Sequence, residues 1–310
     1  MERKIVIYGA GERGRHFYDF LKSKRLNDIV YGFCDRNYRR ICQVEDKVVH
    51  DYEEIKDMGF HYVVSLVNEV ERDKICKKII DDGNTAGTFD SAAELCGEDK
   101  VSFNRELCAF FHKGSMNDYF EKAETAEHLA IFWDSSSPFY QNFSKLNLTN
   151  VIELACGRGR HVPQYISGAN QVTLVDILPE NIAFCKQRFR KYENISYYCN
   201  NGYNLEKLES DSYSSLFCYD AMVHFELMDI YEYLKDIYRV LQKGGYALIH
   251  HSNNGNDFKA AFASAYNGRS FMTKEVFAYL AYRAGFEIVS QQVIDWQIKN
   301  IDCISLIRKN

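Results

Sequence analysis

Two glycines and one acidic residue in the middle of the chain have the types and spacing of a nucleoside-binding site. The segment Val151–Arg160, VIELACGRGR, reads as a buried strand followed by a turn that contains Gly157 and Gly159. A second apolar run, VTLVD, ends at Asp176, 17 residues after Gly159, which leaves room for one helix between the two strands. Glycines let a ligand approach the backbone, and a carboxylate at the end of the next strand can accept both hydroxyls of a ribose. The alternative is an ordinary strand–turn–helix whose glycines serve packing alone.

Three histidines follow later apolar runs and are candidates for a general base. His224 lies in YDAMVHFE, and His250 and His251 close the run YALIHHSN. The ordinary pKa of histidine suits proton transfer near neutral pH, and alternation along a strand lets only one of the adjacent pair face a site. We expect His224, or one of the pair, to take a proton from an acceptor hydroxyl. A structural role for each histidine, or a metal held by Asp220, His224 and His250, is the alternative, although nothing in the spacing requires a metal.

The segments after Asp176 alternate between helical and extended patterns, so they predict an α/β sheet. Apolar residues recur at helical spacing in residues 180–189, 230–241 and 274–284,. Extended runs are expected at residues 195–202, 215–226, 246–253, 286–294 and 301–307. In open α/β sheets, ligands bind at the carboxyl ends of the parallel strands, which is where the glycine turn, Asp176 and the histidines fall.

The residue pattern of the glycine turn indicates which class of cofactor it would bind. E-x-A-C-G-x-G-R resembles motif I of class I S-adenosylmethionine-dependent methyltransferases, whereas a dinucleotide fold favours GxGxxG,. The segments NNG, YDAMVHFE, RVLQKGG, HHSN, VIDW and IDC are similar to those of a bacterial subfamily often found with genes for surface-sugar synthesis. The resemblance spans about residues 115–307. It implies a Rossmann-like, seven-stranded mixed sheet and S-adenosyl-L-methionine as the cofactor.

The resemblance also implies a set of cofactor-binding residues. These are Glu153, Ala155, Gly157, Gly159, Arg160, Asp176, Ile177, Asn200, Asn201, Gly202 and Tyr219. Many relatives carry an acid where Asn201 stands, and we expect the asparagine carbonyl to accept the adenine amine instead. Arg160 is expected to reach a carboxylate, either on the methionine tail or on a charged substrate, unless it is a surface arginine.

The N-terminus carries a second phosphate-loop pattern. In KIVIYGAGERGRHFYDFL, a strand runs into Gly9, Gly11 and Gly14 at GxGxxG spacing, and Asp35 follows 21 residues after Gly14 at the end of another apolar run,. The segment resembles the small Rossmann-like domain that precedes various sugar-modifying transferases. It is expected to bind a nucleotide or nucleotide-sugar, or else to serve dimerisation or stability. A dehydrogenase is a third alternative, but about 110 residues leave no room for its separate hydride-acceptor domain.

We therefore expect two α/β domains. Residues 1–110 form the Rossmann-like nucleotide-binding accessory domain, and residues 115–310 form the methyltransferase domain. Aromatic residues are frequent in a helical cap at about 115–147, where Tyr119, Phe132, Trp133 and Tyr140 are candidates for a substrate mouth or for cover of the sheet.

The composition limits the partners of the protein. The 310 residues have a formal net charge of −5, with 46% hydrophobic and 26% charged residues, as in soluble globular proteins. A negative balance argues against nucleic acid as a partner. No run reaches the roughly 20 apolar residues of a membrane span, and the first strand begins too early for a signal peptide. Ten scattered cysteines without a CxxC pair indicate reduced thiols in a cytoplasm,.

The function expected from the sequence is cytoplasmic O-methylation of a sugar, sugar nucleotide or related small polar metabolite in surface-polysaccharide synthesis. One alternative is N-methylation of an amino sugar or small amine. Another is a non-catalytic nucleotide-binding scaffold in a glycan-assembly complex. The expected partner is a small sugar-type acceptor, and a homodimer is a further expectation.

Overall fold

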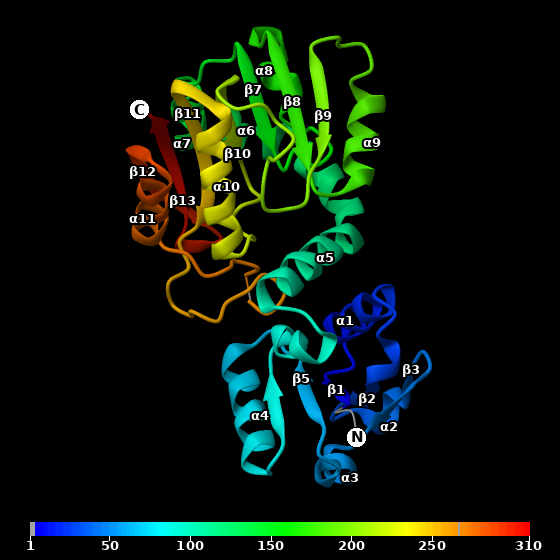
Figure 1. Cartoon of the computed structure of the whole chain (residues 1–310). Helices are drawn as coiled ribbons and strands as arrows, with labels where there is room; N and C mark the ends of the chain where they lie inside the picture. The colour runs from blue at the N-terminus through cyan, green and yellow to red at the C-terminus, as the bar shows by residue number, and fades with distance from the viewer. Residues whose placement is uncertain (1–3, 266) are drawn as a thin grey trace. The chain divides into compact units, whose positions relative to one another are not determined.

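The protein consists of two compact α/β units in a computed structural model that describes residues 4–265 and 267–310, without the side chains of residues 114–118. The first unit contains Met1–Phe111 and Ala261–Gly268, and the second contains His112–Ala260 and Arg269–Asn310 (Figure 1). The helix α5 (Lys100–Ala123) carries the chain from the first unit into the second. Within the described residues, no helix is long and apolar enough to cross a bilayer.

The first unit has a six-stranded sheet in the order β3-β4-β2-β1-β5-β6, and all its pairs except β3–β4 are parallel. The strands are β1 (Ile5–Tyr8), β2 (Val30–Cys34), β3 (Gln43–Val44), β4 (Lys47–His50), β5 (His61–Val64) and β6 (Thr85–Gly87). The helices are α1 (Glu12–Ser23), α2 (Tyr38–Ile41), α3 (Tyr52–Ile55) and α4 (Glu69–Asp81). As the sequence predicts, α1 follows the glycine-rich turn and buries Phe17, Phe20 and Leu21 against the sheet.

The second unit has a seven-stranded mixed sheet in the order β12-β13-β11-β10-β7-β8-β9. Its strands are β7 (Asn150–Leu154), β8 (Gln171–Asp176), β9 (Ile195–Cys199), β10 (Tyr213–Cys218), β11 (Leu241–Ser252), β12 (Phe286–Trp296) and β13 (Ile298–Lys309). The strands β9, β8, β7, β10 and β11 are parallel, and β13 is antiparallel to both β11 and β12. The predicted α/β class and the seven-stranded mixed sheet are confirmed.

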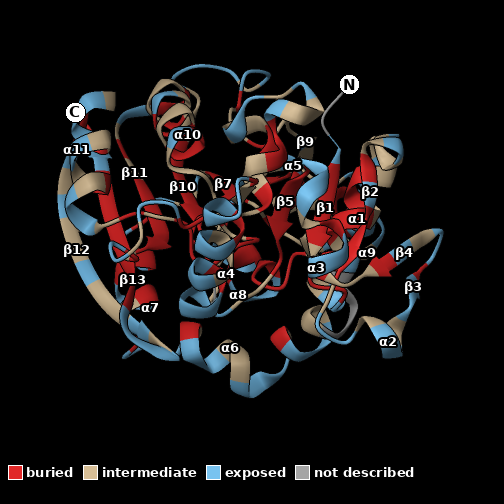
Figure 2. Ribbon diagram, turned by 90° about the horizontal axis from the view of Figure 1, so that it is seen from below, coloured by how far each residue is buried: buried red, intermediate tan, exposed pale blue. Residues whose placement is uncertain are grey.

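Helices cover both faces of this sheet. They are α6 (Ala126–Trp133), α7 (Pro138–Phe143), α8 (Val162–Tyr165), α9 (Pro179–Arg188), α10 (Leu227–Val240) and α11 (Lys274–Ala284). Side chains alternate along β7, so that Val151 belongs to the core on one face while Ile152 and Leu154 belong to the core on the other,. The central strands are therefore buried on both sides, which Figure 2 shows as red ribbons between paler helices. The end of α5 together with α6 and α7 occupies the region of the predicted cap, of which the side chains of 115–118 lie outside the described residues.

One strand is shorter than its sequence pattern. The apolar run at residues 215–226 predicts a continuous strand, but β10 ends at Cys218. Asp220 has a φ of 55°, and a strand cannot continue through a residue in the left-handed region. The remainder of the run, with His224, forms a turn that leads into α10.

A short segment of the C-terminal half belongs to the first unit. Ala263 is buried in the same core as Phe17 and Phe103, and Nη1 of Arg13 donates to its carbonyl at 2.7 Å. Nη1 of Arg72 likewise donates to the carbonyl of Ser264 at 2.7 Å. The chain therefore returns to the first unit in the loop between β11 and α11, which the sequence did not lead us to expect.

Candidate active site

The turn after β7 has a left-handed backbone at three positions. The φ angles are 57° at Ala155, 55° at Gly157 and 73° at Gly159. A Cβ atom at Gly159 would lie 2.4 Å from the ring of Phe189, and one at Gly157 would lie 3.0 Å from the ring of Phe120. Gly159 is therefore required for packing within the protein, as well as for the shape of the turn.

Asp176 fastens the end of β8 to this turn. Its carboxylate accepts from the backbone N–H of Gly157 at 2.8 Å, from that of Leu178 at 2.9 Å and from Nδ2 of Asn181 at 3.1 Å. Burial raises the pKa of Asp176, and these donors oppose the shift. A carboxylate has about four acceptor positions, so one remains for a further donor such as a ribose hydroxyl.

Glu153 is a buried acid near the end of β7, just before the turn. One oxygen, Oε2, accepts from the hydroxyl of Tyr165 at 2.7 Å, whereas Oε1 is buried without a hydrogen-bond partner. Burial raises the pKa of Glu153 to about 8, and the hydrogen bond from Tyr165 opposes this. An unpartnered buried acceptor is costly, and a donor from a bound molecule would relieve that cost.

The two asparagines after β9 have different partners. Oδ1 of Asn201 accepts from the backbone N–H of Tyr203 at 3.2 Å and of Asn204 at 3.0 Å. Both acceptor positions of this carbonyl are therefore used by the turn, so Asn201 would have to give up one of these bonds to accept the adenine amine. Asn200 donates through Nδ2 to the carbonyl of Asn204 at 3.0 Å and to the hydroxyl of Tyr233 at 2.7 Å, which leaves its own carbonyl oxygen as the better acceptor. Gly202, next in the turn, has a φ of 87°.

Arg160 reaches a carboxylate within the protein. Its Nη2 lies 2.8 Å from Oδ2 of Asp220, and its Nη1 donates to the hydroxyl of Tyr119 at 3.1 Å. That hydroxyl in turn donates to Asp220 at 2.5 Å. Burial raises the pKa of Asp220, but the Arg160 charge together with the hydrogen bonds from Tyr119 and Arg160 outweighs burial, so the pKa is lowered overall. Arg160 therefore already pairs with a carboxylate of the protein, and it is buried rather than a surface arginine.

His250 lies at the end of β11 with both ring nitrogens next to protein groups. Nδ1 accepts from the backbone N–H of Asp220 at 3.1 Å, and Nε2 lies 3.2 Å from Oδ2 of Asp302. Arg269 donates to both oxygens of Asp302, at 3.0 and 2.7 Å. Sequence reasoning missed Asp302, because its place opposite Ser252 depends on the register of β13 against β11.

His251 faces away from His250, as the predicted alternation requires. Nδ1 lies 2.8 Å from the carbonyl of Ser252, and Nε2 lies 2.8 Å from the hydroxyl of Ser305. The imidazole stacks on Phe277 with ring centroids 3.9 Å apart, and burial lowers its pKa to about 3. Both nitrogens of His251 are therefore used inside the core, on the side of the strand opposite to His250.

His224 lies in the turn after β10 and is half-buried. Its ring centroid is 4.9 Å from that of His112 on α5, and its backbone carbonyl accepts from the hydroxyl of Ser270 at 2.9 Å. In the described part of the chain, no three His, Cys, Asp or Glu side chains converge in a way that could hold a metal ion.

Aromatic rings gather where β10 and β11 end. Tyr219 stacks on His250 at 4.5 Å and meets the edge of Phe132 at 4.7 Å. Trp296, at the end of β12, stacks on Phe132 at 5.8 Å. Ile177, at the end of β8, contributes its carbonyl to a contact with the thiol of Cys199 at 3.5 Å. Of the predicted site residues, Tyr219 and His250 are thus in direct contact.

The central part of the second unit matches a known protein family by sequence. Residues 152–249 match a family model described as a methyltransferase domain. This range runs from β7 into β11 and contains the glycine turn, Asp176 and Asp220. The chain therefore contains a methyltransferase domain over these residues. A search of curated proteins found no match to the chain.

Several solved structures resemble the methyltransferase domain. An S-adenosylmethionine dependent methyltransferase from Mesorhizobium loti is 15% identical with a TM-score of 0.47, over 57% of this chain and 99% of that one. A SAM dependent methyltransferase from Aquifex aeolicus is 12% identical with a TM-score of 0.47, over 62% and 98%. One from Methanosarcina mazei is 16% identical with a TM-score of 0.45, over 56% and 97%.

The residues of the methyltransferase domain fit S-adenosylmethionine in two respects. Asp176 keeps one acceptor position at the turn, which suits a ribose hydroxyl,. The unpartnered Oε1 of Glu153 suits a donor such as the ammonium of the methionine part,.

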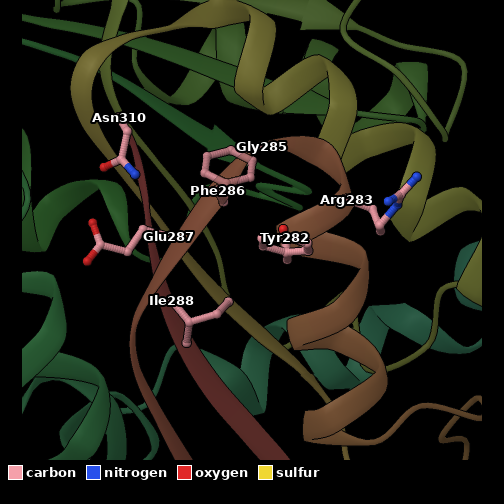
Figure 3. A pocket seen from close by; sticks show the side chains of 7 residues that line it. All are labelled: Tyr282, Arg283, Gly285, Phe286, Glu287, Ile288 and Asn310. Atoms are coloured by element: carbon pink, nitrogen blue, oxygen red, sulfur yellow. The ribbon is translucent and has the colours of Figure 1, made fainter.

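A surface hollow of about 670 Å³ lies elsewhere in the methyltransferase domain. It is lined by Tyr282, Arg283, Gly285, Phe286, Glu287, Ile288 and Asn310 (Figure 3). Phe286 pairs with Lys309, and Arg308 pairs with Tyr246 near the start of β11, so the hollow is at the opposite end of the sheet from His250. It plays no part in the candidate active site.

The turn after β1 repeats the arrangement in the first unit. The carboxylate of Asp35 accepts from the backbone N–H of Ala10 at 2.9 Å. Gly9 has a φ of 108°, and a Cβ at Gly14 would lie 2.0 Å from the carbonyl oxygen of Gly9. At Gly11 a Cβ would meet nothing within 4 Å. Packing therefore explains why residue 14 is a glycine, but it does not explain the glycine at position 11.

Proposed function

We propose that the protein transfers the methyl group of S-adenosylmethionine to a hydroxyl of a sugar, sugar nucleotide or related small polar metabolite. The observation that carries the proposal is the polar group at the carboxyl ends of β10 and β11, where Asp220 and His250 lie beside the turn of the methyltransferase domain. The cofactor supplies an electrophilic methyl group. The chain aligns the acceptor and excludes water, which is most of what such a displacement requires.

In this proposal, residues at the ends of β7, β8 and β9 hold the cofactor. Asp176 accepts a hydrogen bond from a ribose hydroxyl, and the side-chain carbonyl of Asn200 accepts one from the adenine amine. Oε1 of Glu153 accepts a hydrogen bond from the methionine ammonium. Arg160 and Asp220 act as a fixed pair that shapes the floor of the site. Among the predicted histidines, His224 remains a candidate for the base.

The acceptor class follows from the sequence resemblance to enzymes of surface-polysaccharide synthesis, and we place the reaction in the cytoplasm on the same ground. An amine acceptor is the second candidate, because a site that excludes water and a neutral histidine base would also serve N-methylation. A non-catalytic scaffold is the third. The matched methyltransferase domain and the intact Gly157–Asp176 bond argue against it.

Release of S-adenosylhomocysteine tests the proposal. The full chain is incubated with S-adenosylmethionine and a defined set of UDP- and dTDP-sugars, amino sugars and a small-metabolite fraction of a bacterial extract. Mass spectrometry then looks for products heavier by one methylene. Methylated hydroxyls support the proposal, and methylated amines favour the second candidate. Cofactor binding without any product would favour the scaffold.

We further propose that the turn after β1 binds a nucleotide or nucleotide-sugar. The support is Gly11, which caps α1 with an ordinary φ of −76° and has open space where a Cβ would lie. Gly11→Ala should therefore leave the thermal stability unchanged and weaken binding of UDP, UDP-glucose or ADP by calorimetry. Unchanged affinity in this variant, or no binding to the wild type, would leave the first unit as a structural or dimerisation domain.

A further inference from the structure

His128 on α6 lies among the aromatic rings at the ends of β10 and β11. Its imidazole meets Phe132 edge-on at 5.3 Å and Trp296 edge-on at 6.3 Å. Phe132 packs on Tyr219, and Trp296 lies 6.2 Å from the ring of His250. These contacts place His128 at the carboxyl ends of the strands, where ligands bind in open α/β sheets.

The ring of His128 differs from those of His161 and His251 in its partners. Its Nε2 is buried and has no hydrogen-bond partner. By contrast, Nδ1 of His161 accepts from Nε1 of Trp133 at 3.0 Å and its Nε2 lies 3.2 Å from Nε of Arg160. Both nitrogens of His251 have partners at 2.8 Å. Nε2 of His250 also lacks a hydrogen-bond partner, but it lies 3.2 Å from the carboxylate of Asp302. A buried nitrogen without a hydrogen-bond partner calls for an explanation, and a catalytic role is one that fits its place beside the ends of β10 and β11.

The charges around His128 favour its neutral form. The groups that face it are Arg160, Asp220 and His161, with Tyr119 bonded to the first two. Burial lowers the pKa of His128, the Arg160 charge acts in the same direction, and Asp220 opposes them. The ring is therefore neutral at pH 7 and can take up a proton.

We propose that Nε2 of His128 accepts the proton of the acceptor hydroxyl during methyl transfer. The inference rests on the proposed O-methylation and names the base of that reaction. The O–H bond breaks as the new O–CH₃ bond forms, and the electron pair of the broken C–S bond stays on sulfur. The proton moves to Nε2 and then to solvent, so the products are the methyl ether, S-adenosylhomocysteine and one proton. For this, the neutral ring must carry its own proton on Nδ1.

The first test compares two histidine variants. His128→Gln should bind S-adenosylmethionine within threefold of the wild type by calorimetry and lose turnover by about 10²- to 10⁴-fold, the range for removal of a general base. His224→Gln is measured in parallel, because His224 is the other candidate for the base. Glu127→Gln, an exposed neighbour on α6, is the control and should match the wild type. Turnover of His128→Gln near that of the wild type would overturn the proposal, as would a loss confined to His224→Gln.

The second test does not depend on turnover. In the full chain labelled with ¹⁵N-histidine, the signals absent from His128→Gln identify the ring. They should report a neutral imidazole at pH 7 with the proton on Nδ1. A proton on Nε2, or a cationic ring at pH 7, would overturn the proposal. If the wild type binds the cofactor but methylates nothing in the acceptor set, the proposed acceptor class is wrong, and these signals alone decide whether Nε2 is able to accept a proton.

Discussion

The carboxylate of Asp176 is joined to the backbone N–H of Gly157 by a hydrogen bond of 2.8 Å. The bond closes the turn after β7 against the end of β8, before any ligand is involved. Asp35 makes the same bond to the N–H of Ala10 in the first unit, at 2.9 Å. In both units, therefore, the acid expected at a ribose already serves the shape of the turn, and its replacement affects both the turn and the ligand.

Asp176→Ala should weaken S-adenosylmethionine binding by about 10- to 150-fold, since hydrogen bonds to a charged group contribute about 1.5–3 kcal/mol. The variant should also unfold at a lower temperature, because three donors lose their acceptor. Calorimetry measures the affinity, and thermal unfolding the stability. Glu193→Gln, at an exposed position, is the control. Unchanged affinity would mean that the ribose lies elsewhere.

Glu153→Gln should change how the stability depends on pH. The pKa of Glu153 is raised to about 8 in the folded protein from an ordinary 4.5, so between these values the folded state holds a proton that the unfolded state has lost. The wild type therefore loses stability as the pH rises through this window, by up to about 1.4 kcal/mol per pH unit. The glutamine variant lacks this loss. Urea unfolding at pH 6 and pH 8 compares the two slopes, and equal slopes would contradict a buried, protonated Glu153.

Asn201→Asp should leave cofactor affinity within about threefold of the wild type. A carboxylate keeps both acceptor bonds to the N–H groups of Tyr203 and Asn204, so the turn is preserved. Had the side-chain oxygen bound the adenine amine, the added charge would strengthen the contact. Calorimetry on both proteins measures the difference. A tenfold tighter complex would restore the original expectation for Asn201.

Arg160→Met should destabilise the fold by about 3–5 kcal/mol, because it leaves the buried Asp220 carboxylate without its counter-charge,. The double variant Arg160→Met/Asp220→Asn should recover part of this loss. Asparagine tolerates the positive φ of 55° at this position,. Denaturant unfolding measures both proteins. A double variant less stable than the single one would show that the pair does not act as a unit.

The sequence was sufficient for the elements that local periodicity determines. The pattern of α10 at residues 230–241 predicted a helix that the structure places at Leu227–Val240, and the turn with Gly157 was found because glycine spacing is a local signal. β10 was predicted too long, because a run of apolar residues does not reveal that Asp220 leaves the strand conformation.

The pairings within the candidate site were beyond sequence reasoning. Asp302 reaches His250 only through the register of β13 on β11, and Asp220 meets Arg160 only when β10 and the turn after β7 are placed side by side. The side-chain carbonyl of Asn201 accepts from the backbone N–H groups of Tyr203 and Asn204. The sequence does not reveal these bonds, because they depend on the geometry of the turn. Such contacts depend on strand order and turn geometry rather than on composition.

The return of Ala261–Gly268 to the first unit means that the N-terminal part is not a detachable module. A protease cut near residues 98–120 would leave fragments that still share the core around Ala263, and a recombinant piece that begins at residue 112 would carry Ala263 without the residues that bury it. By the same reasoning, exchange of the first 111 residues for another domain would expose Ala263. The loop between β11 and α11 would have to change with them.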